Sequence, residues 1–72
     1  MSKLPALKSR EVARILKRAG FNFVRQKGSH CLYRKDEVSI VVPWHSKDLR
    51  TGTLRKIISC SGLAIEEFLE LR

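Results

Sequence analysis

Three short segments rich in β-branched and aromatic residues follow one another with only turns between them. This spacing constrains the fold more than any other feature of the chain. The segments span residues 21–26, 30–34 and 38–42. The connections, at 27–29 and 35–37, are too short to join anything but antiparallel neighbours, so the sequence predicts a three-stranded antiparallel meander. Pro43 has no N–H to donate to a strand ladder and predicts the end of the third strand.

Helical patterns lie on both sides of these strands. Before them, apolar residues recur at helical spacing between Ser9, the predicted N-cap, and Gly20, the predicted left-handed end. After them, a second helix is predicted from Thr51 to the residue before Gly62, with Cys60 on its buried side. A last short helix is expected to turn three apolar side chains inward, namely Ile65, Phe68 and Leu69.

The predicted order is therefore helix, three strands, helix and short helix, in one domain that spans residues 1–72. A three-stranded sheet covered by helices on one face is a two-layer α+β sandwich. The same α-β-β-β-α order is found in double-stranded-RNA-binding domains, which is an analogy of fold and not of function.

The charge of the chain points to a polyanionic partner. Fifteen Lys and Arg face seven Asp and Glu, for a net charge of +8, and the first 35 residues hold ten basic residues and one acid, Glu11. A positive field of this size favours nucleic acid, although a basic surface that docks on an acidic protein remains open. No run approaches the roughly 20 apolar residues of a membrane span. Residues 1–5 lack a signal-peptide pattern, so we expect a cytoplasmic protein whose Cys31 and Cys60 are reduced.

His30 is the first candidate for chemistry, because it follows a Gly28-Ser29 turn. Backbone amides in such a turn can approach a phosphate closely. Imidazole both takes and gives a proton near neutral pH. In RNA cleavage a base removes the ribose 2′-hydroxyl proton and an acid protonates the departing 5′-oxygen. The alternative is an ordinary surface histidine at the start of a strand.

His45 is the second candidate and follows Pro43 and Trp44. A hairpin of the second and third strands predicts His30 and His45 at the same end of the sheet, where they could divide the acid and base roles. A loop histidine that only binds a phosphate is the alternative. Trp44 is interpreted either as a base-stacking residue or as part of the core edge. Three cations are expected around the histidines, namely Lys27, Arg34 and Lys47, and the first helix adds Arg10, Arg14 and Lys17.

A zinc site would find the right number of ligands in His30, Cys31, His45 and Cys60. Successive side chains on a strand point to opposite faces, however, so His30 and Cys31 do not converge on one ion. We therefore expect no metal site, and we expect Cys31 and Tyr33 to pack toward the helices.

The ordered set of motifs resembles the HicA family of bacterial toxins, the YcfA-like proteins, from Leu7 to Leu69. The motifs are Gly20-Phe21, Gly28-Ser29-His30, Pro43-Trp44-His45, Gly52-Thr53-Leu54-Arg55-Lys56-Ile57-Ile58 and Gly62-Leu63 with Glu66-Glu67-Phe68-Leu69. The resemblance implies a double-stranded-RNA-binding-like fold, a metal-independent and cofactor-free mRNA interferase, and neutralisation by a HicB antitoxin. It also implies a catalytic role for His30 and, less directly, a role for the Pro43–His45 element. Ala64 departs from the family, which often has a serine cap there.

These expectations combine into a toxin of a type II toxin–antitoxin pair that acts as an endoribonuclease on mRNA. His30 is the predicted general acid/base. The residues expected to assist it or bind RNA are Gly28, Ser29, His45, Lys27, Arg34 and Lys47. Two alternatives remain: a non-catalytic RNA-binding module of the same fold, and an interaction protein whose basic face serves only an acidic antitoxin.

Overall fold

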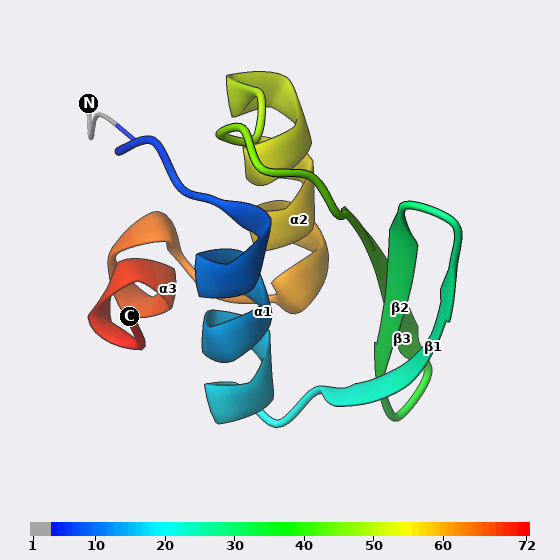
Figure 1. The fold of residues 1–72 in the computed structure, drawn as a ribbon. Helices are drawn as coiled ribbons and strands as arrows, with labels where there is room; N and C mark the ends of the chain where they lie inside the picture. The colour runs from blue at the N-terminus through cyan, green and yellow to red at the C-terminus, as the bar shows by residue number, and fades with distance from the viewer. Residues whose placement is uncertain (1–3) are drawn as a thin grey trace.

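A computed structural model describes residues 4–72, so the first three of the residues examined above for a signal peptide lie outside the described chain. The elements are, in order, α1 (Ser9–Arg18), β1 (Asn22–Lys27), β2 (His30–Lys35), β3 (Val38–Pro43), α2 (Thr51–Ser61) and α3 (Ile65–Glu70). The strands form an antiparallel sheet in the order β1-β2-β3, which confirms the predicted α+β architecture. Figure 1 shows the sheet on one side of the molecule and the helices on the other.

The register of the sheet separates a buried face from an open one. Cys31 pairs with Val42 and Tyr33 pairs with Ile40, and all four side chains are buried. Their neighbours alternate to the other face, because successive side chains of a strand point in opposite directions. The structure thus confirms that Cys31 and Tyr33 pack toward the helices. β1 is exposed along its whole length.

Two helices and a preceding segment cover the buried face. α1 and α2 lie against the sheet, and α3 lies beside α1 on the side away from the sheet (Figure 1). Phe68 of α3 is fully buried in the same core as Leu16 of α1 and Leu54 of α2. The segment before α1 is tied to the loop after β3, because the N–H of Leu49 donates to the carbonyl of Leu7 at 2.9 Å.

Two predictions about single residues are wrong. The N-cap of α1 is Lys8, and Ser9 is the first helical residue, with a buried hydroxyl that bonds to the end of β3 instead of its own helix. Cys60 is exposed, not buried. The inward residues of α2 are Leu54, Ile57 and Ile58, and Cys60 lies about a third of a turn around the helix from Leu54.

Candidate functional site

The turn before His30 is held by two hydrogen bonds. Gly28 has φ = +58°, which is the left-handed region that glycine occupies at little cost, and its carbonyl accepts from Nε2 of Gln26 at 3.0 Å. The carbonyl of Ser29 accepts from the N–H of Trp44 at 2.6 Å. The backbone on the amino-terminal side of His30 is thus fixed to both neighbouring strands.

His30 itself is exposed and lines a shallow hollow on the open face of the sheet. The volume of this hairpin hollow is about 240 Å³, and it is lined by Arg25, Lys27, His30, Leu32 and Val41. Lys27 lies directly opposite His30 in the β1–β2 register, and Arg25 lies opposite Leu32. The irregularity between Phe23 and Arg25 puts both cations on the face that carries His30. The hollow is small, positive and open to a phosphate group.

His45 lines a different hollow. Its neighbours there are Trp44, Ser46 and the first turn of α1, and the volume is about 570 Å³. The Oγ of Ser9 donates to the carbonyl of Pro43 at 2.6 Å and accepts from the N–H of His45 at 3.3 Å. Pro43 is the register partner of His30, and His45 comes two residues after Pro43. Both histidines therefore lie near the same end of the sheet. The sharing of acid and base roles between them stays a prediction.

Arg34 and Lys47, the other two cations predicted around the histidines, lie in different parts of the structure. Arg34 is at the far end of β2, and four residues of strand carry it roughly 13 Å from His30. Its Nε donates to Oγ of Ser39 at 3.2 Å. The structure therefore does not bring Arg34 beside His30 as expected. Lys47 is exposed in the loop between β3 and α2.

A second basic hollow lies along α1. This helix hollow has a volume of about 450 Å³ and is lined by four cations with three other residues, namely Arg10, Arg14, Lys17, Arg18, Ala13, Tyr33 and Trp44. No carboxylate lines it. Trp44 is half-buried and lines both this hollow and the one that holds His45. The pairing of cations with Tyr33 and Trp44 is visible only in three dimensions, because those aromatic residues come from β2 and the loop.

Three titratable groups are shifted by their surroundings. Burial raises the pKa of the Cys31 thiol. Burial also raises the pKa of Tyr33, and the negative charge that Cys31 would carry adds to the effect. The pKa of Glu11 is lowered, chiefly because the backbone N–H of Lys8 donates to its carboxylate at 3.1 Å, and further by Arg72. None of these groups lines the hairpin hollow, so they bear on stability and not on the chemistry of His30.

The four residues that were weighed as zinc ligands do not gather. Cys31 is buried on the helix side of the sheet, His30 is exposed on the open side, and Cys60 is on the surface of α2. Within residues 4–72 no three His, Cys, Asp or Glu side chains form a group that could hold a metal ion.

The fold and the hairpin define a small basic protein with the element order of double-stranded-RNA-binding domains and a histidine on the open face of its sheet. Residues 9–63 match the model of a family described as the HicA toxin of bacterial toxin–antitoxin systems. The chain belongs to this HicA toxin family, and membership implies an antitoxin partner and an RNA target. A comparison with curated proteins gives no match. In the described chain, no helix has the length and apolar character needed to cross a membrane.

Proposed function

We propose that this protein is the endoribonuclease toxin of a type II toxin–antitoxin pair and that it cleaves mRNA with His30 as general acid/base. The observation that carries the proposal is the exposed His30 in one hollow with Lys27 and Arg25, on a hairpin that two hydrogen bonds hold in place. Membership of the HicA family supports it.

The chemistry follows from the groups that line the hairpin hollow. His30 in its neutral form takes the proton of a ribose 2′-hydroxyl, and that oxygen attacks the adjacent phosphorus. The bond to the 5′-oxygen then breaks, and the departing oxygen receives a proton. Negative charge accumulates on the phosphoryl oxygens in between, where Lys27 and Arg25 are positioned to stabilise it. No step of this scheme needs a metal ion.

RNA outside the reacting phosphate is proposed to contact the helix hollow. Arg10, Arg14 and Lys17 supply positive charge for phosphates, and Trp44 supplies an aromatic surface for a base. His45 and Lys47, near the same end of β3, are proposed to bind RNA and not to react with it. We propose a HicB-like protein as the antitoxin, as the family implies.

The experiment is RNA cleavage in EDTA by the wild-type protein, His30→Ala and His45→Ala. A positioned acid/base group typically contributes roughly 10²–10⁴-fold, so His30→Ala is expected to lose cleavage to that extent and to lose growth arrest. His45→Ala is the comparison variant: it removes the same side chain from a different hollow, and because His45 is proposed to bind RNA and not to react with it, a smaller loss of cleavage is expected. Full cleavage by His30→Ala would refute the assignment.

A non-catalytic RNA-binding module is the second candidate. One observation favours it: His30 is the only histidine that lines the hairpin hollow, so no second histidine is placed there to share the acid and base roles. A shift of RNA mobility by the wild-type protein without cleavage in the same EDTA buffer would select this reading.

A further inference from the structure

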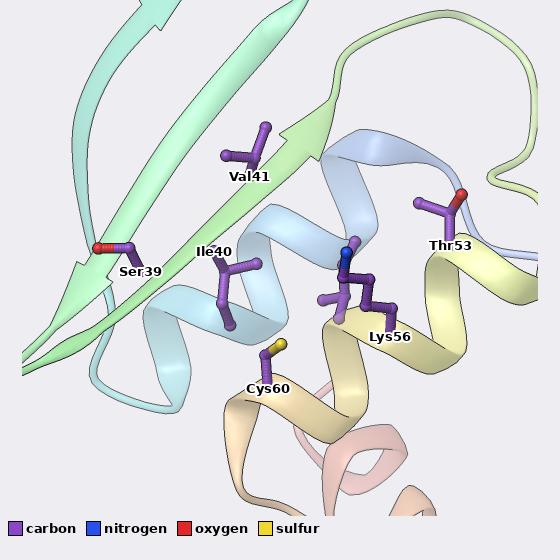
Figure 2. A pocket seen from close by; sticks show the side chains of 7 residues that line it. Ser39, Ile40, Val41, Thr53, Lys56 and Cys60 are labelled. Carbon is purple, nitrogen blue, oxygen red and sulfur yellow. The ribbon is translucent and has the colours of Figure 1, made fainter.

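A groove runs between the outer edge of β3 and α2, on the opposite side of β3 from β2. Its volume is about 380 Å³. Figure 2 shows Ser39, Ile40 and Val41 on β3, with the side chain of Ile40 pointing toward α2, the helix that carries Thr53, Lys56 and Cys60. None of the residues that line this edge groove is acidic. Of the residues that line the hairpin hollow, only Val41 also lines this edge groove.

The alternation of hydrogen bonding along β3 leaves backbone groups of every second residue free on the side of this groove. In an antiparallel pair, residues alternate between those bonded to the neighbouring strand and those that point away from it. The bond from Trp44 N–H to the Ser29 carbonyl fixes the phase, so Ile40 and Val42 bond to β2. Ser39 and Val41 therefore direct their N–H and C=O groups outward. β3 is the last strand of the sheet within residues 4–72, and no further strand pairs with this edge.

The two edges of the sheet are protected to different degrees. β1 carries Arg25 and Lys27 and has an irregular register, and charges and bulges of this kind prevent a strand edge from pairing with another chain. β3 has the sequence Val-Ser-Ile-Val-Val-Pro, without a charge, and only its final Pro43 blunts the edge. The unprotected strand is also the one that α2 flanks with a groove.

We propose that the antitoxin docks here by adding an extended strand to the outer edge of β3, with an acidic side chain on Lys56. This form of recognition uses main-chain hydrogen bonds for affinity and alternate side chains for specificity. The inference rests on the proposed function only in taking the partner to be the antitoxin.

Charge selects the partner over a second copy of this chain. Each copy carries +8, and Lys56 with its exposed neighbour Arg55 would repel the same residues of another copy. An acidic strand gains from the same charges. RNA fits this groove poorly, because Lys56 is the single cation that lines it and could pair with a phosphate. The other groups on offer are the backbone N–H and C=O groups of a strand edge, which suit another strand.

The cysteines of the chain provide a footprint. Cys60 is exposed in the groove and Cys31 is buried, so a maleimide applied to the native protein reports on Cys60 alone. The probe is a HicB-like protein, the antitoxin that the family implies, co-expressed with this chain. We expect labelling of Cys60 to slow at least about tenfold in the complex. Unchanged labelling, or failure of the two proteins to form a complex, would overturn the proposal.

A pair of substitutions at Ser39 tests the strand contact itself. Ser39→Pro removes the outward N–H without breaking a bond to β2, whereas Ser39→Ala keeps that N–H and removes only the hydroxyl. We expect Ser39→Pro to raise the Kd for the antitoxin on the order of tenfold, as expected when a hydrogen bond is lost and its acceptor left unpaired, and Ser39→Ala to bind nearly as wild type. Lys56→Glu, on the exposed surface of α2, tests the charge contact without a change in the strand, and it is also expected to raise the Kd for the antitoxin.

The outcomes separate this proposal from the nuclease assignment. All variants are also assayed for RNA cleavage, which the proposed function assigns to the free protein. Protection of Cys60 together with weak binding by Ser39→Pro and Lys56→Glu supports the docking site, even if no RNA is cut. Equal binding by all variants overturns it, even if RNA cleavage is normal. A dimer of the chain alone in light scattering, with Cys60 protected, would assign the edge to a second copy.

Discussion

We expect the hydrogen bond from Ser9 to Pro43 to contribute strongly to the stability of the fold, although it involves a single hydroxyl group. Oγ of Ser9 donates to the carbonyl of Pro43 at 2.6 Å and accepts from the N–H of His45 at 3.3 Å, and the residue is 1% exposed. Ser9→Ala leaves both backbone groups without this partner at a place that water does not reach freely. An unsatisfied buried group costs about 1–3 kcal/mol, so this is the expected loss in the free energy of unfolding.

Thermal unfolding followed by circular dichroism measures this loss. In a domain of this size each kcal/mol lowers Tm by roughly 4–8 °C, so a decrease well above that of a surface substitution is expected. Ser59→Ala is the matched control, because Ser59 is exposed on α2 and its substitution is expected to cost less than about 0.5 kcal/mol. A Tm for Ser9→Ala within about 2 °C of wild type would show that the segment around His45 is held by other contacts.

Three further predictions concern RNA binding and acid stability. Trp44 is the only tryptophan, so RNA added to the His30→Ala protein should quench its fluorescence if a base stacks on it, and unchanged emission at saturation would contradict this. Arg14→Glu should weaken that binding more than Arg55→Glu, which makes the same charge change on α2. The lowered pKa of Glu11 stabilises the fold above the ordinary glutamate pKa, and this is lost as pH falls through the folded value. Glu11→Gln should therefore have a lower Tm than wild type at pH 7, and the gap should narrow as the pH falls through the folded pKa of Glu11; a gap that stays constant through the acid range would refute the effect.

The strands could be predicted because their determinants are local. Alternation of side chains and the two short connections fix the meander and its hairpin pairing, and they also place Cys31 and His30 on opposite faces. The same reasoning failed for Ser9. Serine favours N-caps, but the partner of this hydroxyl is the carbonyl of Pro43, 34 residues later in the chain, and no local pattern contains that information.

The site could be predicted only in part for the same reason. The hairpin register correctly places Lys27 opposite His30. It also places Pro43 opposite His30, but it does not say which way the chain turns after the strand ends. The turn is decided by the bonds of Ser9, which hold His45 against the start of α1. Arg34 was misplaced because its face was considered and its position along the strand was not: four residues at about 3.3 Å each already separate it from His30.

The two basic hollows lie on different sides of the sheet, and this restricts the RNA that can contact both. The hairpin hollow with Lys27 is on the open face, whereas the helix hollow is on the covered side, where it reaches Tyr33. Trp44 lies at the end of β3 and is bonded to the turn before His30, so it is placed between the two hollows. An RNA that reacts at His30 and stacks on Trp44 must pass around the end of a sheet in a molecule whose extents are 34 × 27 × 17 Å. Nucleic-acid duplexes are stiff over far longer distances than this, and single strands are not. The quenching expected at Trp44 should therefore be produced by single-stranded RNA and not by a duplex of the same sequence.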